Sequence, residues 1–159
     1  MQPMLRGAAY RVALLGLRAW WVVARPRSSG VRCVLRHGGA IVLVRHGYGD
    51  RRWMLPGGRA RAGEPPVAAA AREMGQELGV RASGWREVGA IPARRGGWRR
   101  PSRDEPFRRH ATTYVAGEVA GRTLAPRRGE IAEAAWFDVS ALPEDRQEEL
   151  DLAVAAGWV

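Results

Sequence analysis

Two glutamates in the middle of the chain, Glu73 and Glu77, stand four residues apart. In an α-helix this spacing places both carboxylates on one face, where they repel each other unless positive charge neutralises them. Nearby arginines and solvent can supply that charge, as on an ordinary surface helix. A bound divalent cation can also supply it, because carboxylate oxygens are hard ligands that suit Mg²⁺ or Mn²⁺. The pair alone leaves both interpretations open.

The segment that precedes the pair favours the metal site. Gly57 and Gly58 allow the backbone to adopt conformations closed to other residues and to approach a ligand closely. Glu64 follows six residues after Gly58, at a position from which its side chain can fold back toward the same acidic face. A glycine turn followed by glutamates at these spacings is more specific than any one of its parts.

Proline and glycine mark the ends of a predicted helix over residues 66–79, since Pro65 and Pro66 stand at its start and Gly79 at its end. At about 100° per residue, its apolar residues form one seam for packing against a sheet, and the carboxylates project from the other side. Gln76 falls on the polar side, so core packing does not explain it. The seam consists of Val67, Ala71, Met74 and Leu78.

β-Branched residues and turn residues predict the remaining elements. Residues 31–37 and 40–46 favour two strands joined at Gly38-Gly39 as a hairpin. Strands interleaved with one central and one terminal helix predict a single α/β sandwich domain over residues 28–159. The other expected elements are a tight turn over residues 53–58, strands over 85–93, 111–121 and 132–139, and a closing helix over 143–156.

The net charge of +10 comes entirely from arginine, because the chain contains no lysine. This bias makes the charge weak evidence for nucleic-acid binding, and we expect no specific nucleic-acid partner. The basic residues of segment 81–128 either attract a phosphorylated small molecule or form a solvated surface. The lone Cys33 excludes an internal disulfide and a cysteine-rich zinc site, and it fits a reducing compartment.

Together, the glycine turn and the glutamates resemble the signature of the Nudix hydrolases. That signature reads Gly, five residues, Glu, seven residues, then Arg-Glu-aliphatic-x-Glu-Glu-x-Gly-aliphatic. The resemblance covers residues 31–157 and extends to the segments "LPGG" and "AEAAWFDVSALP". Gln76 is the one departure among nine defined positions. The matching residues are Gly58, Glu64, Arg72, Glu73, Met74, Glu77, Gly79 and Val80.

The resemblance implies an α/β/α sandwich around a mixed sheet and a metal-dependent pyrophosphohydrolase. The implied substrate is a nucleoside diphosphate linked to another moiety, and the implied cofactor is Mg²⁺ or Mn²⁺. Glu73 and Glu77 correspond to metal-binding glutamates, one of which also serves as a base. Arg72 would orient these glutamates by a bidentate ion pair, and Glu64 would support the acidic site as a further candidate metal ligand. A carbonyl of Gly57 or Gly58 would complete the metal shell.

A later glutamate acts as a ligand or base in some members of that family. Glu130 is our candidate for this role and Glu133 is the reserve, although "RRGEIAE" also suits an ordinary charged loop. Three further residues are candidate substrate contacts. They are Arg59 in the glycine turn, and Tyr48 and Trp53, which either stack on a base or fill the core.

Other features leave the substrate open. Arg94, Arg95, Arg99 and Arg100 lie in a long basic loop that either clamps phosphates or is simply solvated. No secondary signature selects ADP-ribose, coenzyme A, a dinucleoside polyphosphate or an oxidised nucleotide.

Gln76 raises an alternative to catalysis. Glutamine keeps the carbonyl oxygen of glutamate but loses its charge, so Gln76 can still coordinate a metal weakly or through water. We therefore expect weakened metal binding or fewer metal ions, with activity retained but shifted toward Mn²⁺. The alternative is a catalytically weakened domain that binds a nucleotide or a partner.

Residues 1–27 are predicted to form an amphipathic helical arm, in which Arg11, Arg18 and Arg25 recur every seven residues as one basic stripe. This arm can dock on its own domain, lie on a membrane through residues 4–25, or act as a signal peptide. A membrane location would make a lipid-linked pyrophosphate a third hypothesis for the substrate. We expect a cytoplasmic protein, with peripheral membrane contact as the alternative.

Overall fold

The computed structural model describes residues 27–47, 49, 51–92, 109–127 and 129–159. The compact unit considered below comprises Ser29–Ile91 and Thr112–Val159. The predicted amphipathic arm, apart from its last residue, lies outside the described residues, and so do Tyr48 and the four arginines of the basic loop. Within the described ranges, no helix is long and apolar enough to cross a membrane.

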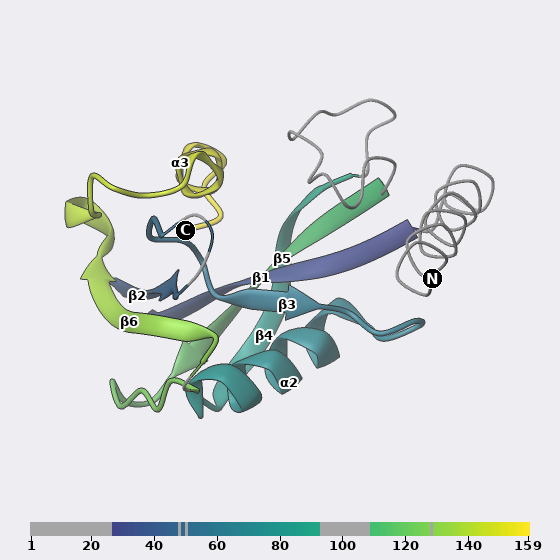
Figure 1. The fold of residues 1–159 in the computed structure, drawn as a ribbon, viewed down its shortest axis with the longest axis horizontal. Coiled ribbons are helices and arrows are strands. Elements are labelled where there is room, and N and C mark those ends of the chain that lie inside the picture. The colour runs from purple at the N-terminus through teal and green to yellow at the C-terminus, as the bar shows by residue number, and fades with distance from the viewer. Residues whose placement is uncertain (1–26, 48, 50, 93–108, 128) are drawn as a thin grey trace, which may run out of the picture. The chain divides into compact units, whose positions relative to one another are not determined.

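Six strands form one sheet with the order β4-β5-β1-β2-β6, and the short strand β3 pairs with β1 outside this path (Figure 1). The predicted hairpin is confirmed, because β1 and β2 pair antiparallel through Arg36 with Ile41 and His37 with Ala40. The strands are β1 (Arg27–His37), β2 (Ala40–His46), β3 (Gly57–Arg59), β4 (Ala82–Ile91), β5 (Arg109–Val119) and β6 (Ile131–Asp138).

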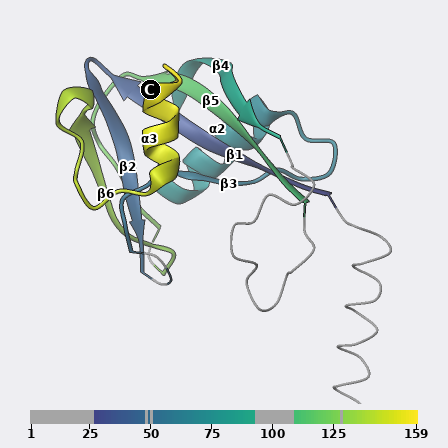
Figure 2. The same ribbon diagram turned by 90° about the horizontal axis from the view of Figure 1, so that it is seen from above.

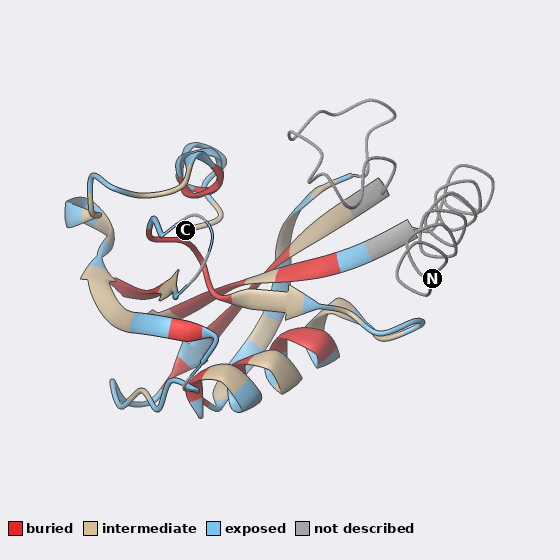
Figure 3. Ribbon diagram, viewed as in Figure 1, coloured by how far each residue is buried: buried red, intermediate tan, exposed pale blue. Residues whose placement is uncertain are grey.

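Two helices cover opposite faces of this sheet, so the predicted α/β sandwich is confirmed (Figures 1 and 2). Alternation along β1 sends Cys33 and Leu35 into the core beneath helix α2, whereas Val34 enters the core beneath helix α3. Red buried segments therefore follow the central strands in Figure 3. Helix α2 spans Pro66–Leu78 and α3 spans Glu148–Ala155.

Helix α2 begins and ends close to its expected limits. Pro occupies the first turn, and Gly79 ends the helix with φ +65° while its N–H bonds to the carbonyl of Met74. The predicted seam needs correction, because Ala71 is exposed and Ala69 and Ala70 are fully buried. The helix is thus rotated toward its acidic side. The carboxylates border the core instead of projecting away from it.

Two predicted segments fold differently from expectation. The glycine turn forms strand β3, in which Gly57 pairs with Arg32 of β1. The closing helix begins five residues later than expected, at Glu148. Residues just before it are held extended instead, since Trp53 donates its N–H to the carbonyl of Asp145 and accepts the N–H of Gln147.

The close approach of β3 to β1 requires glycine at position 57. A Cβ added at Gly57 would overlap the carbonyl oxygen of Val31, which belongs to the backbone and cannot rotate away. We expect Gly57→Ala to lower the free energy of unfolding by about 1–3 kcal/mol, as overpacking does. Gly75→Ala is the matched control, because Gly75 is exposed within α2 and a Cβ there meets nothing. This control should stabilise by about 0.5–1 kcal/mol in urea denaturation.

Candidate functional site

Arg72 is bound by two glutamates and one carbonyl at the start of the acidic face of α2. Its Nε and Nη2 each donate to Glu64 at 2.8 Å, and its Nη1 donates to Glu73 at 2.7 Å. Nη2 also donates to the carbonyl of Arg59 at 3.0 Å. The side chains of Arg72, Glu64 and Glu73 are 18%, 14% and 14% exposed. The guanidinium therefore fixes the loop after β3 and the first carboxylate of the helix together.

Both carboxylate oxygens of Glu64 accept hydrogen bonds from within the protein. Its second oxygen also accepts the backbone N–H of Arg61 at 2.8 Å. Bonding to Arg72 first, and to Arg61 second, lowers the pKa of Glu64 to about 2. Both oxygens are thus committed within the protein. We therefore remove Glu64 from the expected metal ligands and keep it as the residue that holds Arg72.

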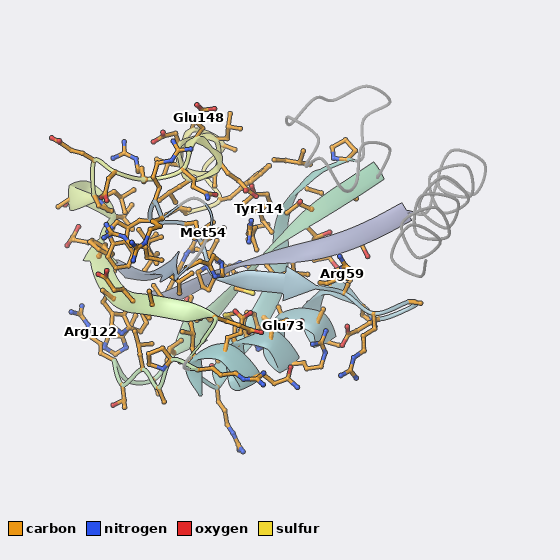
Figure 4. All side chains as sticks on the ribbon, in the orientation of Figure 1. Met54, Arg59, Glu73, Tyr114, Arg122 and Glu148 are labelled. Atoms are coloured by element: carbon orange, nitrogen blue, oxygen red, sulfur yellow. The ribbon has the colours of Figure 1, made fainter. Side chains whose placement is uncertain are left out.

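Gly58 lies directly against the carboxylate of Glu73. A Cβ at Gly58 would overlap the carboxylate carbon and lie 2.7 Å from both oxygens. Figure 4 shows the labelled Glu73 between α2 and β3. A side chain at position 58 would displace this carboxylate, so the glycine is needed for the position of Glu73 and not for a positive φ.

Glu77 is a half-buried carboxylate with no hydrogen bond or ion pair to any other described residue. Burial first, and then the negative charges of Glu73 and Glu130, raise the pKa of Glu77 to about 7, against the lowering effect of Arg32 and Arg127. The same glutamate lies close enough to Cys33 to add to the burial that raises the pKa of the thiol. In the part of the chain that the structure describes, Arg32 and Arg127 thus act on this carboxylate only from a distance, without an ion pair.

The β5–β6 loop, residues 120–130, packs against the C-terminal end of α2 (Figure 1). The N–H of Ala125 bonds to the carbonyl of Leu78 at 2.8 Å, and the N–H of Arg127 bonds to the carbonyl of Glu77 at 2.7 Å. These bonds use carbonyls that a helix end leaves without partners. The loop is thereby held beside the second metal-ligand candidate.

Glu130 ends this loop with its backbone fixed and its side chain exposed. Its carbonyl accepts the Nδ1–H of His46 at 3.1 Å and the N–H of Gly47 at 3.4 Å. Its charge reaches Glu77, as the raised pKa of Glu77 indicates. Glu133 instead forms an ion pair with Arg45 at 3.4 Å. Of the two candidates, Glu130 is therefore the one that lies near the acidic face.

The remaining candidates occupy different surroundings. Trp53 is only 7% exposed and meets Phe137 edge-to-face at 4.8 Å. This corresponds to the core-filling alternative and leaves little ring surface for a base, so we remove Trp53 from the substrate contacts. Gln76 is exposed and has no recorded partner among the described residues. Arg59 is exposed and is the last residue of β3 (Figure 4).

The residues present suit a hard divalent cation whose coordination shell is completed by a bound substrate and water. Among the described residues, no group of three or more His, Cys, Asp and Glu side chains is already spaced to hold a metal. Glu77 nevertheless presents a carboxylate that pairs with none of the described residues, and Glu73 retains one oxygen that Arg72 does not bind. Mg²⁺ is commonly held by one or two carboxylates together with substrate phosphates and water. Glu73 and Glu77 fit this pattern.

Sequence reasoning did not single out Arg127. It stands 50 positions after Glu77, and only the packing of the β5–β6 loop brings it to the acidic face. The excess of arginine in this segment concealed it, since nothing in the composition distinguishes Arg127 from its neighbours.

The raised pKa of Glu77 predicts a pH-dependent cost in the metal-free protein. The unfolded state loses this proton near pH 4.5 and the folded state near pH 7, so stability should fall across that range and level off above it. Glu77→Gln should remove the fall. Allowing for partial exposure, the metal-free variant should be about 1–2 kcal/mol more stable than the natural protein at pH 8.

Thermal melts in chelator at pH 5 and pH 8 test this expectation. Glu87→Gln, at an exposed position on β4, makes the same charge change as a control. Equal pH dependence in the natural protein and Glu77→Gln would contradict the cost assigned to Glu77.

Comparison with known proteins decides the family. The NUDIX domain model matches residues 25–156 of the 159-residue chain. The chain belongs to the Nudix hydrolase family. The resemblance drawn from the glycine turn and the glutamates is therefore confirmed.

The curated relatives of this Nudix protein include an ADP-ribose pyrophosphatase and an NAD-capped RNA hydrolase. The ADP-ribose pyrophosphatase of Mycobacterium tuberculosis is 33% identical over 134 residues, which cover 65% of this chain and 63% of the relative. The NAD-capped RNA hydrolase NudC of Deinococcus radiodurans is 33% identical over 132 residues, which cover 74% of this chain and 43% of the relative. The chain thus spans less than two thirds of the length of either relative.

Solved structures share the Nudix fold at low identity. A MutT NUDIX hydrolase from Burkholderia pseudomallei superposes with a TM-score of 0.67 and 16% identity, covering 82% of this chain and 98% of that one. A UDP-X diphosphatase gives a TM-score of 0.60 at 23% identity, covering 84% of this chain and 65% of that one. These likenesses support the fold alone.

Proposed function

We propose that the protein hydrolyses a pyrophosphate bond in a nucleoside diphosphate linked to a second moiety, using a divalent cation bound by Glu73 and Glu77. The observation that carries this proposal is the Glu77 carboxylate, which is half-buried, has no partner among the described residues and lies near two further glutamates. An uncompensated acidic cluster costs stability unless a cation joins it. Membership of the Nudix family supports a catalytic role for that cation.

The residues of the site divide the work as follows. Arg72 holds Glu73 in place through its fork, and Gly58 leaves the room that this carboxylate occupies. Glu77 or Glu130 accepts the proton of the attacking water. The carbonyl of Gly57 would complete the metal shell, and Arg59 would contact the substrate. When bound, Mg²⁺ or Mn²⁺ neutralises the phosphate oxygens and the leaving oxygen.

For the substrate, we propose an adenosine diphosphate joined to a sugar or a second nucleotide. The names of the mycobacterial and deinococcal relatives support ADP-ribose and an NAD-like group. The exposed Gln76 stands beside the cluster without a charge, so we propose fewer or weaker metal ions and better activity with Mn²⁺ than with Mg²⁺. The boundary near residue 28 between the arm and this catalytic domain is part of the same proposal.

A panel assay tests the function. The purified protein is incubated with ADP-ribose, NADH, coenzyme A, diadenosine polyphosphate and an oxidised nucleoside triphosphate, with Mg²⁺ or Mn²⁺, beside Glu77→Gln and Gln76→Glu. We expect turnover of ADP-ribose or NADH by the natural protein and none above background by Glu77→Gln. If only Gln76→Glu is active, the natural protein is a catalytically weakened binding module, and the hydrolase proposal is wrong.

A further inference from the structure

The β5–β6 loop places Arg127 near the acidic face of α2. Among the arginines that act on Glu73 or Glu77 are Arg32, Arg72 and Arg127. Two of these already have partners. Arg72 is bound by Glu64 and Glu73, and Arg32 donates to the buried Glu149 of α3 at 3.2 Å.

Arg127 differs from the other two. Its side chain is exposed and forms no hydrogen bond or ion pair with any described residue. Its backbone, in contrast, is firmly held, because its N–H bonds to the carbonyl of Glu77 at 2.7 Å and its carbonyl accepts the N–H of Ile131 at 3.5 Å. The protein thus fixes the base of this side chain while leaving the guanidinium available.

The charges around Arg127 specify the kind of ligand it suits. Glu77 and Glu130 lie close enough to interact with each other, but neither pairs directly with the guanidinium. When Glu77 and its neighbours bind a metal, the metal contacts only some of the oxygens of a bound phosphate. The Arg127 guanidinium beside these carboxylates is placed to contact the remaining phosphate oxygens. A guanidinium offers two parallel N–H donors that match phosphate oxygens, so the matching ligand is a phosphate group of the substrate.

We infer that Arg127 is a substrate-binding residue that contacts the diphosphate beside the metal-bearing carboxylates. This inference rests on the proposed function, because it needs a diphosphate at Glu73 and Glu77. It places a phosphate contact on the β5–β6 loop. The basic loop at residues 94–100, for which the sequence leaves both phosphate binding and solvation open, lies outside the described residues. Because Arg127 already contacts the diphosphate in the enzyme–substrate complex, before the reaction, this contact contributes mainly to KM.

Steady-state kinetics with ADP-ribose and Mn²⁺ provide the first test. We expect Arg127→Ala to raise KM at least tenfold and to change kcat by less than about threefold. Arg127→Lys, which keeps the charge and loses the fork, should recover part of the affinity. Arg122→Ala is the matched control on the same loop, because the Arg122 guanidinium lies 6.0 Å from the Trp136 ring and Figure 4 shows it away from Glu73. The control should leave KM unchanged.

Titration calorimetry with ADP and Mn²⁺ separates this inference from the proposed function. If the natural protein hydrolyses ADP-ribose while Arg127→Ala keeps its KM within twofold, the role of Arg127 is refuted and the hydrolase function stands. If no substrate turns over but Arg127→Ala weakens ADP binding at least tenfold relative to Arg122→Ala, the role of Arg127 stands and the hydrolase function fails. Equal ADP affinity of both variants, or no ADP binding by the natural protein, overturns the inference.

Fold is checked by circular dichroism before either measurement. Arg127→Gln replaces Arg127→Ala if the latter does not fold, since glutamine keeps most of the stem and removes the charge. The same tenfold increase in KM is then expected, and an unchanged KM overturns the inference in this variant too.

Discussion

Glu73→Gln is expected to lower kcat/KM on the order of 10²–10³-fold, the range for a single group that stabilises developing charge. Glutamine has nearly the shape of glutamate, so the loss would report charge and not volume. Two contacts fail together in this variant. The carboxylate that faces the proposed metal becomes neutral, and the 2.7 Å ion pair with Arg72 Nη1 is lost.

Binding and activity are measured side by side for this prediction. Isothermal titration with Mn²⁺ should show weaker binding to Glu73→Gln, and kinetics with ADP-ribose should show the fall in kcat/KM. Glu118→Gln makes the same charge change at an exposed position of β5 and should behave like the natural protein. Retention of more than a tenth of the activity by Glu73→Gln would show that this carboxylate is not a principal ligand.

Arg72→Ala is expected to lower kcat/KM by about 10–100-fold, as is usual when a residue that orients metal ligands is removed. The variant leaves Glu64 and Glu73 without the cation that both now share. Their repulsion would move Glu73 away from Gly58 and from the position needed beside Glu77. Arg72→Lys should recover little, because one ammonium cannot reproduce the fork that joins two carboxylates and the carbonyl of Arg59.

The acid limb of stability provides a second measurement for Arg72. Glu64 has a pKa lowered to about 2, so its ion pair contributes stability above pH 4.5 that is lost as the pH falls toward 2. Arg72→Ala should remove this contribution, so that its melting temperature changes less than that of the natural protein between pH 5 and pH 2.5. Arg86→Ala, at an exposed position on β4, serves as the control and should keep the natural profile.

Local signals predicted the elements whose causes are local. The Gly38-Gly39 turn lies between two β-branched runs, and the hairpin formed there. Prolines and Gly79 set the limits of α2 almost as expected. Strand β3 could not be predicted this way, because its three residues have no apolar alternation. It exists through pairing with β1, which lies 25 residues earlier at the pair nearest in sequence, Arg32 and Gly57.

The same difference between local and long-range contacts explains which features of the site the sequence did not predict. Helical geometry placed Glu73 and Glu77 on one face, but geometry within one helix does not say how that face is oriented against the rest of the domain. The packing of β3 and of the β5–β6 loop rotates it partly inward, and Glu77 thereby loses solvent. Arg127 reaches the site only through this packing, so no spacing in the sequence indicates that it lies beside Glu77.

The contact between Gly58 and Glu73 has a consequence for how this protein can change. Position 58 has no functional group, yet any side chain there would displace the carboxylate that we propose as a metal ligand. A substitution at Gly58 would therefore be detected first as a loss of metal affinity, in a protein whose fold is otherwise intact. We therefore expect variation at the two positions to be coupled, with a side chain tolerated at position 58 only when the acid at position 73 is shortened or withdrawn.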